Sequence, residues 1–161
     1  MTWEDDLQKF LLQKNAGNKI KTDDGKTLNS IIKSEGKRFK QILQKHIDAY
    51  YASYEPKIYK RTDLFKNSLE VDTKVEDMSI RVFFNDNAWH LSLTKNDFKL
   101  RFVPTLIDSG WKWKVAKYPI YRFTWFEGDH YIKAAIDEFN RNNPYNLSIE
   151  VQSEFNTKYY N

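Results

Sequence analysis

The sequence predicts an α+β fold in which a long N-terminal helix and a C-terminal helix pack on a mostly antiparallel sheet that carries a protruding β-hairpin or arm. Apolar residues recur three and four positions apart near both ends of the chain, which is typical of amphipathic helices. Between these stretches, apolar and polar residues alternate in short runs bounded by turn residues, which is typical of strands. The segment 121–139, YRFTWFEGDHYIKAAIDEF, changes from alternation to helical spacing at Gly128. We expect its aromatic strand to pack on the helix that it feeds.

The first 26 residues are expected to form an N-terminal helix and a loop. Residues 3–14 are amphipathic, and the acidic residues at their start favour a helix through its dipole. The glycine, asparagine and aspartate residues of 15–26 are typical of a loop. With 161 residues, the chain is long enough for one hydrophobic core, and we expect a single domain over 1–161.

A long helix is expected in the segment 27–55. Thr27 is a suitable N-cap residue, and apolar residues continue at helical spacing up to Tyr54. Pro56 ends the helix, because the residue before a proline is disfavoured in the α region. Gly36 lies inside this helix and weakens it by about 1 kcal/mol relative to alanine.

A helical turn and three strands are predicted after the long helix. Thr62 or Asp63 is expected to cap the turn. Alternation predicts strands over 69–75 and 78–84 and a third strand that begins at Trp89. The turns between them are Glu76-Asp77 and Asn85-Asp86-Asn87.

The segment 94–120 is interpreted as a hairpin or arm inserted between two sheet strands. Alternation over 98–102 stops at Pro104, and Ser109-Gly110 precedes a run of tryptophan and lysine. After the strand 121–126, the final helix is expected from about Asp129 to Asn142. The last elements are a strand over 147–151 and a flexible tail over 153–161.

Composition excludes several kinds of chemistry. The chain contains no cysteine, which removes disulfides, thiolate zinc sites and cysteine catalysis. The three histidines, His46, His90 and His130, lack partners at metal-ligand spacing, so we expect structural or surface roles. No apolar run is long enough to predict a transmembrane helix, and no nucleotide-binding or hydrolase motif occurs. No cofactor and no metal are expected.

Two acidic residues, Glu127 and Asp129, flank Gly128 where the strand passes into the final helix. Such a pair could act as general acid and base, or bind a cation. The interpretation that we favour is that one of them caps the helix and complements its dipole. Gly128 is then expected to permit close packing.

The run Trp111-Lys112-Trp113-Lys114 alternates rings and cations. It could stack bases and hold phosphates. It could equally form a hairpin strand in which tryptophan faces a neighbouring protein and lysine faces water, and we favour this protein contact. Arg61 lies in a small basic cluster that could meet an acidic surface or a DNA backbone. The candidate interface residues are therefore Trp111, Trp113, Lys112, Lys114 and Arg61.

The segment 61–69, RTDLFKNSL, resembles the motif Arg-Thr-Gly-x-Leu-x-x-Ser-Leu of the neck or tail-completion proteins of tailed bacteriophages. These are head–tail joining proteins, sometimes labelled minor capsid or tail components. Asp63 stands in place of the motif's glycine and Phe65 in place of its leucine; aspartate tolerates the left-handed conformation better than most residues. The matching positions are Arg61, Thr62, Ser68 and Leu69.

Two later segments resemble the same family. The segment 109–113, SGWKW, is similar to a glycine-tryptophan hairpin stretch, and 128–136, GDHYIKAAI, is similar to the pattern Gly-x-x-Phe/Tyr-Ile-x-x-Ala-Ile before a terminal helix. The resemblance extends over residues 27–151. Its three motifs occur in the family's order.

The resemblance implies a non-enzymatic subunit of a homo-oligomeric ring, a hexamer or a dodecamer, in the virion neck or tail, assembled in the host cytoplasm. The implied partners are connector or head-closure proteins and tail-terminator or tail-tube proteins, with channel DNA as a further candidate and no membrane. A ring needs a heterologous interface that closes. The alternative function is a nucleic-acid-binding module that uses Trp111–Lys114. A small hydrolase that uses Glu127 and Asp129 is a third hypothesis.

Overall fold

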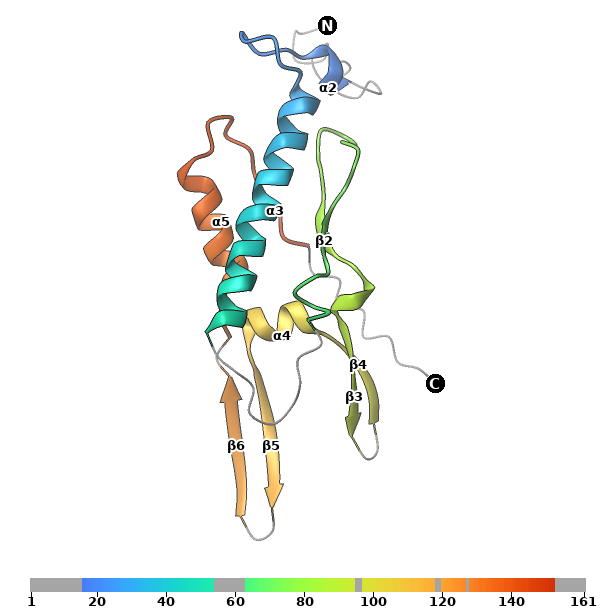
Figure 1. The fold of residues 1–161 in the computed structure, drawn as a ribbon, viewed down its shortest axis with the longest axis vertical. Coiled ribbons are helices and arrows are strands. Elements are labelled where there is room, and N and C mark those ends of the chain that lie inside the picture. The colour runs from blue at the N-terminus through green and yellow to red at the C-terminus, as the bar shows by residue number, and fades with distance from the viewer. Residues whose placement is uncertain (1–15, 54–62, 95–96, 118–119, 127, 153–161) are drawn as a thin grey trace, which may run out of the picture. The chain divides into compact units, whose positions relative to one another are not determined.

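The structure is a computed structural model that describes residues 16–53, 63–94, 97–117, 120–126 and 128–152. The described part has an α+β fold in which a long helix packs against the C-terminal helix, with antiparallel two-stranded hairpins (Figure 1). The chain divides into two compact units, residues 1–41 with 70–83 and residues 42–69 with 84–161. The expected helix over 3–14 and the tail over 153–161 lie outside the described residues.

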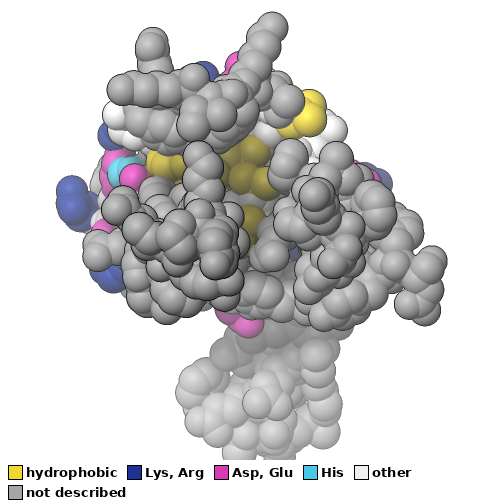
Figure 2. All heavy atoms as spheres, turned by 90° about the horizontal axis from the view of Figure 1, so that it is seen from below, with side chains coloured by type: hydrophobic (Ala, Val, Ile, Leu, Met, Phe, Trp, Pro, Cys, Tyr) yellow, Lys and Arg dark blue, Asp and Glu magenta, His cyan; other side chains and the backbone are white. Residues whose placement is uncertain are grey.

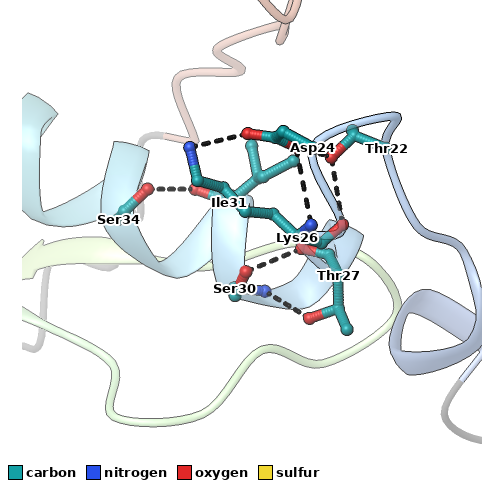
Figure 3. A network of polar contacts seen from close by, with 7 residues as sticks. All are labelled: Thr22, Asp24, Lys26, Thr27, Ser30, Ile31 and Ser34. Carbon is teal, nitrogen blue, oxygen red and sulfur yellow. Dashed lines mark hydrogen bonds and ion pairs between the residues drawn. The ribbon is translucent and has the colours of Figure 1, made fainter.

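The helix α3, Leu28–Ala52, confirms the prediction of a long helix in the segment 27–55. Thr27 caps it as expected, because its Oγ1 accepts a hydrogen bond from the backbone nitrogen of Ser30 at 3.2 Å (Figure 3). A short helix, α2 (Ala16–Lys19), occupies part of the segment that was expected to be a loop. Asn29 of α3 donates to Asn18 of α2 at 3.0 Å, so a side chain from the long helix holds this extra turn in place.

A polar turn connects α2 to α3 in the first unit (Figure 3). Asp24 accepts a hydrogen bond from the Thr22 hydroxyl and lies 2.8 Å from the Lys26 ammonium. The hydrogen bond from the Lys26 side chain, followed by that from Thr22, lowers the pKa of Asp24 to about 2. Gly25 has a φ of 79°, which suits a glycine. The turn therefore fixes the approach to the Thr27 cap.

The hairpin formed by β1 (Leu69–Val71) and β2 (Val82–Phe84) is shorter than the two predicted strands. Its turn is centred on Asp77 and Met78, with φ values of 47° and 54°, rather than on Glu76-Asp77. Two hydrogen bonds of 3.0 and 2.8 Å close this turn between Glu76 and Ser79. Positive φ at both central residues is the geometry of a type I′ turn, whose twist matches the strands.

Gly36 has a packing role that its sequence context did not reveal. An added Cβ at this position would lie 2.6 Å from Cγ2 of Ile80. The glycine in the middle of α3 therefore allows the residues before β2 to approach the helix closely. Gly36 lowers the helix propensity of α3, but its lack of a Cβ permits the contact with Ile80.

The core of the second unit consists of aromatic and aliphatic side chains. Rings form a continuous series in which Phe65 packs on Phe84 at 5.6 Å between centroids, Phe84 on Phe102 at 6.1 Å, and Phe102 on Trp89 at 5.1 Å. Among the described residues, the buried apolar residues of this unit are Leu43, Ile47, Tyr50, Phe65, Leu69, Ala88, Pro104, Ile107, Tyr131, Ala135 and Phe139. Rings thus carry much of the core, as the high aromatic content suggests.

The segment 94–120 contains several elements instead of one inserted arm. They are the end of β3 (Trp89–Thr94), β4 (Asp97–Phe102), α4 (Val103–Ser109) and β5 (Trp111–Lys117). β5 pairs with β6 (Ile120–Phe126), so the third hairpin in chain order is formed by strands 111–117 and 120–126. The prediction missed α4 because Pro104 was taken as a stop, whereas a proline in the first turn of a helix is favourable.

The strands of the described residues form three separate two-stranded sheets, β1–β2, β3–β4 and β5–β6, and not the single sheet that was predicted. The turn at 85–88 is a 3₁₀ helix, η1 (Asp86–Ala88), capped by Asn85. The expected strand over 147–151 is wrong: these residues form no strand. The Asn143 side chain instead bonds both backbone groups of Leu147, at 2.7 and 2.9 Å.

Candidate functional site

Parts of the three segments that resemble the phage motifs, residues 63–69, 109–110 and 128–132, meet in the second unit around Tyr131. We call this region, together with the preceding residues 104–108 of α4, the motif junction. Its geometry is described first, followed by the candidate interface residues.

The first segment of the motif junction is a tight turn that begins at Asp63. Asp63 has a φ of 56°, in the left-handed region, and its carbonyl accepts a hydrogen bond from the backbone of Asn67 at 3.1 Å. The Ser68 hydroxyl is fully buried and donates to the carbonyl of Phe65 at 2.7 Å. Phe65 and Leu69 are both 4% exposed. The position at which the family has glycine therefore needs a residue that tolerates positive φ.

The second and third segments touch through their backbones at Gly128. An added Cβ there would lie 2.7 Å from the nitrogen of Gly110 and 2.8 Å from the carbonyl carbon of Ser109, and closer still to the carbonyl oxygen of Asp108. Gly128 also has a φ of 93°, and Gly110, which ends α4, has a φ of 81°. The expectation that Gly128 permits close packing is confirmed.

The cap of the final helix, α5 (Tyr131–Arg141), differs from the prediction. Glu127 lies outside the described residues, and among the described residues no capping bond from the Asp129 carboxylate to α5 is found. The N-cap position is His130, which has a φ of 54° and no side-chain cap bond. Instead, Oδ1 of Asp108 accepts a hydrogen bond from the backbone nitrogen of Ile132 at 2.8 Å. A carboxylate from α4 thus satisfies the start of α5.

Two further backbone bonds join the end of α4 to the start of α5. Asp129 donates from its nitrogen to Ile107 at 2.8 Å, and His130 donates to Asp108 at 3.1 Å. Asp129 is therefore held at this junction through its backbone. Because Glu127 lies outside the described residues, an acid and base role for the pair stays a prediction.

Tyr131 is the residue on which the motif junction converges. Its ring lies 6.2 Å from that of Phe65, and its hydroxyl donates to the carbonyl of Pro104 at 3.0 Å. The side chain is 1% exposed, and burial raises the pKa of its hydroxyl. A tyrosine held in this way joins the turn at 63–69 to α4 and α5. Its role here is structural.

The long helix and α5 are linked by a polar contact at the surface. Glu138 of α5 lies 2.9 Å from the Lys45 ammonium and 2.9 Å from Nε2 of His46, both on α3. The hydrogen bond from Lys45 is the main cause that lowers the pKa of Glu138. Figure 2 shows Lys and Arg side chains at the edge of the face that is seen from below, with hydrophobic side chains between them. His46 has the structural role expected for it.

The candidate interface residues are placed only by their backbone. Residues 111–114 lie on β5, where Trp111 pairs with Phe126, Lys112 with Trp125, Trp113 with Thr124 and Lys114 with Phe123. Arg61 lies outside the described residues. The role of these five residues at an interface stays a prediction, as does the packing of strand 121–126 on the helix that follows it.

Sequence reasoning missed Asp108 and α4. Asp108 is 24 positions from the nitrogen that it caps, so no local pattern relates the two residues. A signal for α4 was present, since Pro104 opens and Gly110 closes a short apolar stretch, which is a helix start and a helix stop.

Within the described ranges, no helix is both long and apolar enough to span a membrane, and no cluster of three or more metal-ligating side chains is present. Comparison with family models, with curated protein sequences and with solved structures finds no match to this chain.

Proposed function

We propose that the chain is a non-enzymatic structural subunit of a tailed-phage neck, which forms a ring and joins or completes the tail at the head–tail interface. The observation that carries this proposal is the convergence of the three motif-like segments. Phe65 of the first segment contacts Tyr131 of the third, and Gly128 of the third packs on Gly110 of the second. Three short resemblances that are far apart in the sequence thus belong to one packed unit.

The backbone of the motif junction also supports the proposal. The motif's glycine is replaced by Asp63, and that position has a φ of 56°. The other two glycine positions of the resemblance, Gly110 and Gly128, have φ values of 81° and 93°. Asp63 thus keeps a left-handed conformation at the position where the motif has glycine, the residue that adopts positive φ most readily.

Under this proposal the β5–β6 hairpin is the arm that reaches a neighbouring subunit. Trp111 and Trp113 are its anchors, since large aromatic residues are enriched at the centres of protein interfaces. The neighbours are further copies in a hexameric or dodecameric ring, a connector or head-closure protein, and a tail-terminator or tail-tube protein. The chain has no catalytic step and needs no cofactor.

Particle assembly in the absence of the chain tests the proposal. Electron micrographs should then show filled heads and separate tails that fail to join, and the wild-type chain supplied in trans should restore joined particles. Trp111→Ala combined with Trp113→Ala should fail to restore them while leaving the unfolding midpoint of the purified chain unchanged. Joined, infectious virions formed without the chain would overturn the proposal.

A further inference from the structure

The hairpins β3–β4 and β5–β6 of the second unit differ in how polar and apolar residues are distributed between their two faces. Directly opposed residues in an antiparallel pair lie on the same face, and successive positions alternate between faces. One face of β3–β4 holds only apolar pairs and the other holds only polar or charged pairs. The apolar pairs are Trp89 with Phe102, Leu91 with Leu100 and Leu93 with Phe98; the polar pairs are His90 with Arg101, Ser92 with Lys99 and Thr94 with Asp97.

Such sorting is what a hairpin with one buried and one solvated face requires. The described ends of β3 and β4 agree with it, because Trp89 and Phe102 join the series of rings in the core.

The β5–β6 hairpin is not sorted in this way. Its register places Lys112 opposite Trp125, Lys114 opposite Phe123 and Ala116 opposite Tyr121. The two lysines therefore share one face with three aromatic positions spaced two residues apart. We call this set, Lys112, Lys114, Tyr121, Phe123 and Trp125, the basic ribbon face. The sequence suggested that the lysines of β5 face water. That hypothesis does not explain why the same face also holds Tyr121, Phe123 and Trp125.

The charge of this hairpin is equally distinctive. Its strands, WKWKVAK and IYRFTWF, contain four basic residues and no Asp or Glu. The net charge of the whole chain is also +4, so the rest of the chain is balanced. A face that combines cations, in strands without Asp or Glu, with a row of ring positions matches a ligand that has both negative charges and flat aromatic faces.

We propose that the basic ribbon face binds single-stranded nucleic acid, with bases stacked at Tyr121, Phe123 and Trp125 and phosphates paired with Lys112 and Lys114. An acidic protein surface would use the cations and leave the row of rings without a role. A duplex offers phosphates but keeps its base faces stacked inside, whereas an unpaired strand offers both groups. This inference rests on the register of β5–β6 and not on the proposed role in a virion.

The test is fluorescence anisotropy of the wild-type chain with a labelled single-stranded oligothymidylate and with a duplex of the same length. Two lysine–phosphate contacts to a single strand give a salt slope of about −1.4, so affinity should fall about sevenfold between about 50 and about 200 mM salt. The oligothymidylate should bind more tightly than the duplex, because only its bases are free to stack.

Variants assign the contacts. Lys112→Gln with Lys114→Gln should remove the salt slope of about −1.4. Phe123→Leu and Trp125→Leu should each weaken binding at least about fivefold with the slope unchanged. The matched control is Lys99→Gln with Arg101→Gln, which removes the same charge from the polar face of β3–β4 and should leave affinity and slope unchanged.

If the wild-type chain does not bind at low salt, or binds the duplex with equal affinity, the inference is overturned without any variant. Equal binding to vesicles that contain phosphatidylserine would overturn it too, because it would reveal general affinity for anions. A loss of affinity in the control variant as large as in the lysine variant would place the binding elsewhere.

Discussion

Replacement of Gly128 by alanine tests the packing of the motif junction most directly. Gly128 has a φ of 93°, and an added methyl group would lie 2.7 Å from the nitrogen of Gly110. The atoms that it meets belong to the backbone at the end of α4, which cannot rotate away as a side chain can. Gly25 offers a matched control, since it has a φ of 79° and an added Cβ would have nothing within 4 Å.

The expected destabilisation has two parts. A non-glycine residue in the left-handed region costs about 1–2 kcal/mol, and alanine recovers about 0.4–1 kcal/mol by restricting the unfolded chain. Both variants share this part. Overpacking against fixed atoms adds about 1–3 kcal/mol in Gly128→Ala alone. We therefore expect a free-energy loss of about 2–4 kcal/mol for Gly128→Ala and about 1 kcal/mol for Gly25→Ala.

Urea unfolding followed by circular dichroism measures both values, and a thermal scan gives an independent reading. For a chain of this length, a loss of about 2–4 kcal/mol corresponds to a melting temperature lower by about 6–12 °C. If Gly128→Ala were no more destabilising than Gly25→Ala, the close approach of α4 to the start of α5 would be incorrect. The contact between the second and third motif-like segments, Gly110 with Gly128, would then be incorrect too.

Three further changes probe other contacts. Asp108→Ala should destabilise the chain by about 1 kcal/mol in urea unfolding, because it removes the cap of α5, whereas Asp129→Ala should stay within about 0.5 kcal/mol; the reverse order would return the cap to Asp129. Gly36→Ala should destabilise the wild-type chain but stabilise an Ile80→Ala background by about 1 kcal/mol through helix propensity, and the same sign in both backgrounds would exclude the Gly36–Ile80 contact. Glu138→Gln should remove a pH dependence: the pKa of Glu138 is lowered in the fold, so its contribution to stability is present above the ordinary value of 4.5 and is lost as pH falls through the folded pKa. Unfolding midpoints measured from pH 3 to 7 should therefore converge for variant and wild type at the acid end, and a constant offset at every pH would contradict this reading.

Patterns within one element predicted that element well. The periodicity of α3 and its cap at Thr27 depend on residues a few positions apart, and both predictions are confirmed. The strand at Trp89 and the turn at Asn85 are equally local and were also found. These interactions lie within the range over which a sequence pattern carries information.

The remaining features depend on residues brought together from distant parts of the chain. Gly36 is understandable only once Ile80 lies against it, and the cap of α5 comes from Asp108. The acidic residues beside Gly128 offered a nearer cap, and the prediction chose them because proximity in sequence was the only available guide. Pro104 has two opposite meanings, stop or first turn, and the presence of α4 decides between them.

The structure also distinguishes residues whose identity is explained by packing from residues whose identity is not. At the motif junction, Asp63, Gly110 and Gly128 meet backbone requirements, and Tyr131 is buried and bonded to Pro104. Each of these positions is explained by packing, so its replacement should change stability and assembly together. The β5–β6 hairpin lacks the separation of polar and apolar faces seen in β3–β4, and its composition is not explained by burial of one face. A substitution that alters assembly or binding while leaving the free energy of unfolding unchanged should therefore lie in that hairpin and not in the motif junction.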